Sequence, residues 1–131
     1  MSILDTRVIL YPQAMNHLLR SKTGPVGRDL HKRGMKVLVA AKAQVGVKTG
    51  KLKASINIDH GIDIRGQYVK IGSNARYALA HHEGTRPHVI TPNRAQVLRF
   101  SSRGRIVYAR AVMHPGTKPN KYLTDNLRLI R

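Results

Sequence analysis

The first half of the chain contains two stretches whose apolar positions recur at the spacing of an α-helix. In residues 9–19 the apolar side chains follow Pro12, a residue that the first turn of a helix tolerates. Residues 21–25 then break the pattern. From Val26 to an expected stop at Gly46, apolar or small residues lie four, four, three and four positions apart. This spacing predicts a long helix with one buried face, made of Leu30, Gly34, Leu38, Ala41 and Val45.

Beyond residue 50 the pattern changes from a helical period to the alternation that is typical of β-strands. Residues 56–71 predict two consecutive antiparallel strands, placed around the turn residues 60–61 and 65–67. The first half of the chain is therefore expected to be helical and the middle to form a sheet.

The remainder of the chain predicts a second hairpin and two more helical segments. Strands over 97–100 and 106–112 would be joined across residues 101–104. Residues 77–82 predict one helical turn, and residues 119–131 place apolar side chains at helical spacing before a basic end. The fold class is therefore α+β, with a mostly antiparallel sheet packed by a long N-terminal-half helix and a C-terminal helix.

A chain of 131 residues is expected to form one domain. The predicted domain covers residues 1–131 and has three segments: a helical segment over residues 1–47, a sheet-forming segment over residues 52–113 and a C-terminal helix over residues 119–131.

The amino-acid composition predicts the type of core and excludes some classes of protein. Aromatic residues make up 5% of the chain, with no Trp and one Phe, Phe100, so an aliphatic core is expected. Such a core suits a lean monomer or a subunit that completes its burial against neighbours. The chain has no cysteine, which excludes disulfides and thiolate metal sites. Neither a signal peptide nor a membrane span is evident, so a soluble, unexported protein without membrane contact is expected.

Charge predicts an acidic partner. Lys and Arg total 24 against six Asp and Glu, which gives a formal net charge of +18. Charge of this size opposes compaction unless a partner offsets it, and by itself it would favour DNA. The basic residues are spread from Arg7 to Arg131 rather than gathered in one tract, which favours acidic protein surfaces. The predicted partner-docking residues lie on the polar side of the long helix: Lys32, Arg33, Lys36 and Lys42.

The sequence contains no convincing pattern of catalytic or metal-binding residues. His81 and His82 are adjacent, whereas a zinc-binding helix needs two His four residues apart, with a third ligand elsewhere. Of the six acids, only Asp59 and Asp63 lie near each other, across an apparent turn, and a two-metal nuclease needs more carboxylates. Nucleophile elbows and phosphate-binding loops are also missing from the sequence. We therefore expect no enzyme and no catalytic, cofactor-binding or metal-binding residues.

Three stretches together resemble the tail-component family of siphophages, also called neck or tail-completion proteins. The first resembles the family's Thr-Gly-x-Leu-x-x-Ser-Ile segment, the second its Tyr-Ala-x-x-x-Glu-x-Gly-Thr-x-x-His stretch, and the third its His-Pro-Gly-Thr-x-Pro-Asn signature. In order along the chain, the residues that carry the resemblance are Thr49, Gly50, Leu52 and Ser55, then Tyr77, Glu83, Gly84, Thr85 and Pro87, then His114, Pro115, Gly116, Thr117, Pro119 and Asn120.

The chain departs from the family at two places. Lys121-Tyr122 stands where the family continues Pro-Phe, which keeps the aromatic residue and loses the proline. The pair His81-His82 is also foreign to the pattern. The first departure bears on where the last helix begins, and neither bears on the role of the protein.

Physical chemistry gives the motifs an architectural role. Gly84 permits a positive φ, and Pro87 holds Arg86 extended, so this stretch is expected to form a rigid corner. Gly116 is expected to form a second corner before the last helix, which Asn120 could cap.

The resemblance implies helices against a curved sheet and a structural virion protein at the head–tail junction of a long-tailed phage. It implies a homo-oligomeric ring, expected to be a hexamer, that contacts a head-closure or stopper protein and a tail terminator or tail tube protein. DNA in the lumen is a further expected contact, and the host cytoplasm is the expected place of assembly. The alternatives are a basic DNA-binding protein acting on phage or host DNA, and an enzyme built on His81, His82 and Glu83.

Overall fold

The computed structural model describes residues 7–130. Residues 1–6, at the start of the predicted helical segment, and Arg131, at the end of the predicted C-terminal helix, lie outside the described residues. The chain forms two compact units, one containing residues 7–75 and 122–130 and the other residues 76–121. The single domain expected over residues 1–131 stays a prediction, because compact units can belong to one cooperatively folding domain.

Two helices begin the first unit, and both are confirmed. Helix α1 (Pro12–Arg20) and helix α2 (Pro25–Gln44) each start with a proline, whose fixed φ suits the first helical position. Helix α2 ends at Gln44, and Val45 is its C-cap with extended backbone, so the expected stop residue Gly46 directly follows the cap. This extended conformation buries the Val45 side chain, which is 2% exposed.

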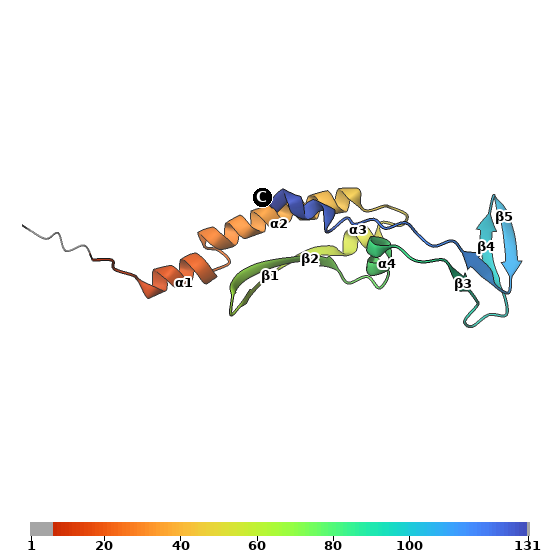
Figure 1. Cartoon of the computed structure of the whole chain (residues 1–131), viewed down its shortest axis with the longest axis horizontal. Coiled ribbons are helices and arrows are strands. Elements are labelled where there is room, and N and C mark those ends of the chain that lie inside the picture. Colours follow the sequence, from red (N-terminus) through yellow and green to blue (C-terminus); the bar gives the residue numbers. More distant parts are fainter. Residues whose placement is uncertain (1–6, 131) are drawn as a thin grey trace, which may run out of the picture. The chain divides into compact units, whose positions relative to one another are not determined.

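The buried face of α2 packs against a long hairpin that follows it (Figure 1). The short helix α3 (Lys51–Ser55) leads into strand β1 (Ile56–Asp63), which pairs antiparallel with β2 (Gly66–Ser73). Gly34 makes close packing possible, since a Cβ at this position would lie 2.7 Å from Ile58 Cδ1 and 2.8 Å from Val69 Cγ1. The glycine thus allows the helix backbone to approach the hairpin.

The predicted turn at residues 60–61 is wrong, because β1 continues through it. In the register of the hairpin, His60 lies opposite Val69 and Gly61 opposite Tyr68. The Tyr68 ring occupies the space in which a side chain of Gly61 would lie, so the glycine makes room for an aromatic ring. Only the turn beyond Asp63 reverses the chain.

The core of the first unit is mostly aliphatic, but its largest fully buried side chain is Tyr122. The expectation of a purely aliphatic core is therefore wrong. Tyr122 is 1% exposed, and its burial raises the pKa of its hydroxyl above the ordinary value of 10.0. The other buried apolar residues of this unit come from α2, its C-cap, α3 and the start of β1: Val37, Leu38, Ala41, Val45, Leu52 and Ile56.

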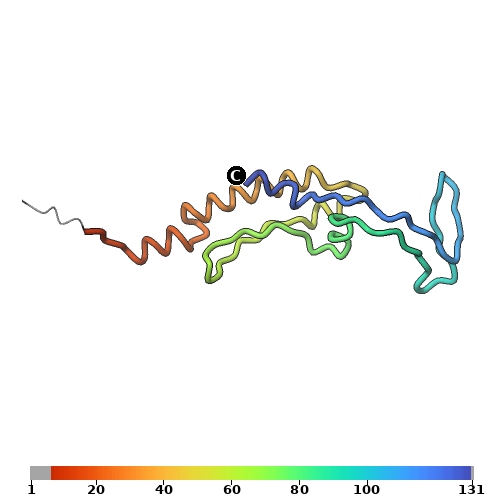
Figure 2. The backbone as a smooth tube through the Cα atoms, in the orientation of Figure 1, coloured from red at the N-terminus to blue at the C-terminus, as the bar shows by residue number. Residues whose placement is uncertain are grey.

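The C-terminal helix lies beside α2, as Figure 2 shows, but it is shorter than predicted. It is the 3₁₀-helix η1 (Asp125–Ile130), so Asn120 lies too far upstream to cap it. Instead, Asn126 Nδ2 donates hydrogen bonds to Tyr122 O at 2.7 Å and to Gln44 Oε1 at 2.8 Å. The local bond to Tyr122 O supports the start of η1, and the bond to Gln44 holds η1 to the end of α2.

The second unit contains a short helix and two small antiparallel sheets. Helix α4 (Ala78–Glu83) confirms the expected helical turn. Strand β3 (His88–Ile90) pairs with β6 (Val112–His114), and β4 (Leu98–Ser102) pairs with β5 (Arg105–Ala109). The β4–β5 hairpin is confirmed, but the expected extension of its second strand to residue 112 is wrong, because Val112 belongs to β6.

The α+β class is confirmed. All strand pairs within residues 7–130 are antiparallel, and they form three two-stranded sheets.

Candidate functional site

The two glycine corners of the second unit meet each other. Gly84 has φ +75° and Gly116 has φ +86°, which is the left-handed region expected of both. Between them, Thr85 and Thr117 exchange two backbone hydrogen bonds, of 3.0 and 3.1 Å. The two threonine hydroxyl oxygens also lie 2.7 Å apart, within hydrogen-bond distance. Two motifs that are far apart in the sequence therefore form one paired corner.

Both glycines are required by space as well as by φ. A Cβ on Gly84 would lie 2.5 Å from Thr117 O and 2.9 Å from Pro119 N. A Cβ on Gly116 would collide with Thr85 O. The obstacles are backbone atoms of the opposite corner, which cannot rotate away as a side chain can.

Two histidines flank the paired corner. His88 and His114 lie opposite each other on β3 and β6, with their ring centroids 5.1 Å apart. The Gly116 amide donates a hydrogen bond to His114 Nδ1 at 3.0 Å, and His88 Nδ1 lies 2.8 Å from Arg86 O. The His of the His-Pro-Gly signature thus orients the glycine two residues after it.

The first motif is placed in the other unit, where it starts the β1–β2 hairpin. Gly50 is left-handed, with φ +76°, and caps α3. Leu52 is buried in the core, while Ser55 Oγ lies 2.8 Å from Leu52 O and 2.6 Å from Ser73 Oγ. Thr49 is exposed and precedes the turn. The motif therefore ties α3 to both strands of the hairpin.

The structure does not bring together a catalytic or metal-binding set from the candidate residues. His82 is buried, and its Nδ1 lies 2.6 Å from Glu83 Oε1. Asp59 and Asp63 lie four residues apart on the same strand, about 13 Å along it, and not across a turn. Among residues 7–130, no group of three or more His, Asp or Glu side chains could hold a metal ion.

The predicted docking residues on α2 differ in how far they are available to a partner. Arg33 is engaged within the chain, because its Nε lies 2.8 Å from Asp29 Oδ2 and its Nη1 donates to Ile130 O at 3.2 Å. Lys42 is half-buried. Lys32 and Lys36 are exposed and line a shallow groove together with apolar residues: Met35, Val39, Ala40, Ala43 and Leu129.

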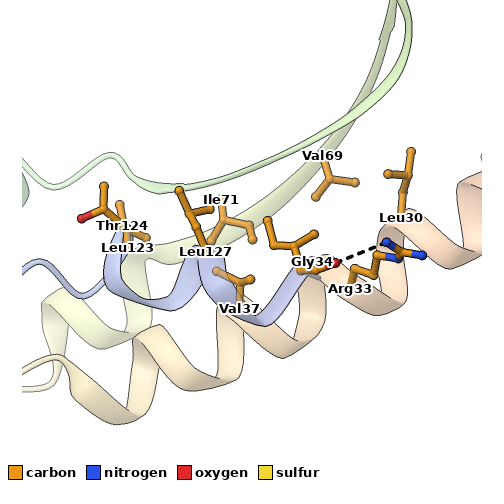
Figure 3. A pocket seen from close by; sticks show the side chains of 10 residues that line it. Leu30, Arg33, Gly34, Val37, Val69, Ile71, Leu123, Thr124 and Leu127 are labelled. Carbon is orange, nitrogen blue, oxygen red and sulfur yellow. Dashed lines mark hydrogen bonds between the residues drawn. The ribbon is translucent and has the colours of Figure 1, made fainter.

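An apolar cavity of about 250 Å³ lies within the first unit, between α2, β2 and the C-terminal segment (Figure 3). Leu30 and Val37 of α2, Val69 and Ile71 of β2, and Leu127 of η1 line it, and Arg33 lies at its edge. Leu127 is half exposed, so one wall of the cavity faces the surface. The cavity can accept an apolar side chain.

Sequence reasoning missed Tyr122 and Asn126, the residues that anchor the C-terminal segment. An aromatic residue following the third motif was a signal for Tyr122. Asn126 gave no signal as an anchor, because its partner Gln44 is brought to it only by folding.

A comparison with known protein families finds one similarity. Residues 25–81 match the model of the family described as "Bacteriophage HK97-gp10, putative tail-component". This stretch of the chain is similar to a phage tail component. The expected family resemblance is thus confirmed over α2, the β1–β2 hairpin and the start of α4. The match ends at residue 81, so the second motif from Glu83 onward and the whole third motif lie outside it. The chain matches no curated protein and no solved structure. None of the helices between residues 7 and 130 combines the length and apolar character that crossing a membrane requires.

Proposed function

We propose that the protein is a ring subunit at the head–tail junction of a long-tailed bacteriophage, without catalytic activity. The ring, a hexamer, joins a head-closure or stopper protein to a tail terminator or tail tube protein. It assembles in the host cytoplasm and remains in the neck of the virion. The similarity of residues 25–81 to a tail component supports this role.

The observation that carries the ring proposal is apolar surface left uncovered on α1. This helix has no buried residue, and its apolar residues Met15, Leu18 and Leu19 are all exposed. The four apolar residues before it, 8–11, are exposed as well. A contiguous apolar patch on a small protein marks an interaction site. A second copy of the chain would cover it.

A closed ring also needs a second, different surface, because its subunits contact one another head to tail. The apolar cavity between α2, β2 and η1 supplies such a surface. In the proposed ring, α1 of one subunit places Leu18 or Leu19 in the cavity of the next. The exposed lysines of the α2 groove then remain available to contact the neighbouring ring.

The ring is tested by electron microscopy and mass measurement of the purified protein. Leu18→Glu should leave the subunit folded and monomeric, because a buried carboxylate in the contact is costly. Ile64→Glu is the control, since Ile64 is 95% exposed at the tip of the β1–β2 hairpin. A ring that persists in Leu18→Glu would refute the assignment of α1.

The junction role is tested in the phage. Loss of the gene should leave filled heads and separate tails that do not join into infectious particles. Normal virions formed without the protein would defeat the proposal.

The docking assignment is tested by charge reversal. Lys32→Glu with Lys36→Glu should block attachment to the neighbouring ring and leave DNA affinity mostly intact. Lys51→Glu with Lys53→Glu, at exposed positions of α3, makes the same change in net charge as a control. If the α2 reversal instead abolishes DNA binding while virions still assemble, the alternative of a DNA-binding protein takes precedence.

A further inference from the structure

The β4–β5 hairpin carries positive charge in a stretch of the chain without acidic residues. No Asp or Glu occurs between Glu83 and Asp125. Within that stretch the hairpin and its flanks contain five arginines and no lysine: Arg94, Arg99, Arg103, Arg105 and Arg110. All five are exposed, and none has an acidic partner among residues 7–130. The hairpin therefore carries uncompensated guanidinium groups.

The register of the hairpin distributes these groups over both faces and the tip. Arg99 lies opposite Tyr108, and Ser102 lies opposite Arg105. Cross-strand neighbours share a face, so Arg99 and Arg105 lie on different faces. The tip is Arg103-Gly104, where both residues have positive φ, 49° and 78°, which makes the reversal tight. The result is a narrow ribbon with arginines around it.

Exposed aromatic residues lie among the arginines. Phe100 is 37% exposed and Tyr108 63% exposed. A strand pair with so little burial gains little stability from a core of its own, so its side chains are available for a partner.

The charge decides which partner the hairpin fits. A second copy is disfavoured, because pairing two such hairpins would bring ten guanidinium groups together without an anion. An acidic partner is required, and arginine, with its planar fork of donors, matches phosphate oxygens in a bidentate manner. A two-stranded ribbon also fits the width of the DNA major groove.

We propose that the β4–β5 hairpin binds double-stranded DNA through the phosphate backbone, without sequence preference. The proposal deepens the proposed function and rests on it for the source of the DNA, which passes through the ring. Phosphate contacts carry no sequence information, so they would hold DNA of any sequence in the channel.

The test uses the full chain and a 30-base-pair duplex of mixed sequence, titrated at several salt concentrations. The hairpin variant is Arg99→Gln, Arg103→Gln and Arg105→Gln. The matched control, Lys32→Gln, Lys36→Gln and Lys51→Gln, removes the same charge from exposed positions of the other unit. Circular dichroism and thermal unfolding confirm that both variants are folded.

We expect the hairpin variant to lower the slope of log affinity against log salt by about 2 to 3, since each phosphate contact contributes about 0.9. The control should change the slope by less than about 1. A second variant, Arg99→Lys, Arg103→Lys and Arg105→Lys, should keep most of the salt slope. This result would show that the charge of these side chains causes the salt dependence.

Two outcomes would overturn the proposal. An equal decrease of the salt slope in the hairpin variant and in the control would show that the net charge of the protein binds DNA without a defined site. Unchanged DNA binding together with failure of head–tail joining would show that the hairpin contacts an acidic protein. Because ring formation is measured separately by electron microscopy, a negative result at the hairpin leaves the ring proposal standing.

Discussion

The paired glycine corner gives the sharpest test of the structure, through Gly84→Ala compared with Gly104→Ala. Both glycines have a similar positive φ, +75° for Gly84 and +78° for Gly104, and Gly84 also has an extended ψ of 178°. They differ in space, because a Cβ on Gly104 meets nothing within 4 Å, whereas a Cβ on Gly84 meets the backbone of Thr117 and Pro119. The pair therefore compares a positive-φ glycine in open space with one whose surroundings leave no room for a Cβ.

The expected magnitudes follow from this difference. Left-handed backbone costs an alanine about 1 to 2 kcal/mol, which is the whole loss expected for Gly104→Ala. In Gly84→Ala the new Cβ must move away from Thr117 O, which breaks the two backbone hydrogen bonds between Thr85 and Thr117. Each bond contributes about 1 kcal/mol, so the total loss should be about 3 to 4 kcal/mol.

The measurement is urea unfolding followed by circular dichroism, with the free energy of unfolding extrapolated to water. Gly116→Ala should behave like Gly84→Ala, because its Cβ collides with Thr85 O. Equal losses for Gly84→Ala and Gly104→Ala would refute the reasoning, since the close backbone approach would then cost nothing. Joining of heads and tails should fail only in the two corner variants.

Three further predictions concern residues around the core and the corner. Asn126→Ala should destabilise the protein by about 2 kcal/mol in urea unfolding, because it leaves Gln44 Oε1 and Tyr122 O without this donor; a loss below about 0.5 kcal/mol would contradict the anchoring role. His114→Leu should cost about 1 kcal/mol more than His114→Asn, since an Asn oxygen can still accept the Gly116 amide; equal stability of the two variants would show that this bond is unimportant. Burial raises the pKa of Tyr122, so the protonated hydroxyl contributes its full stability below pH 10.0, and this stability is lost as the pH rises through the folded-state pKa. Between pH 9 and 11 the free energy of unfolding of Tyr122→Phe should therefore decrease less than that of the unmodified chain. Parallel curves of unfolding free energy against pH would argue against an ionisable buried tyrosine.

Local patterns in the sequence were sufficient for several elements. The 3.6-residue period predicted α2 and its buried positions Gly34, Leu38 and Ala41, because a helix repeats its face on that spacing. The two short strand patterns on either side of residues 101–104 predicted the β4–β5 hairpin. Gly84 and Gly116 were expected at positive φ from their neighbours alone. These features depend on residues a few positions apart, which the sequence displays directly.

Other features depend on residues that meet only in the folded chain. A Gly suggested a turn at residues 60–61, but pairing with Tyr68 on the adjacent strand kept β1 continuous. The pairing of β3 with β6 joins segments more than 20 residues apart and has no local signal. The same is true of the corner itself, where Thr85 bonds with Thr117.

The sequence by itself determined the α+β class, the long helix, the glycine conformations and the unbalanced positive charge, because each follows from local sterics or from composition. Only the tertiary structure decided that the two glycine corners meet, that Tyr122 and Asn126 anchor the C-terminal segment, and that Arg33 is engaged while Lys32 and Lys36 remain exposed. The physical reason is that burial and hydrogen-bond partners are set by segments distant in the chain, whose approach no single local pattern records.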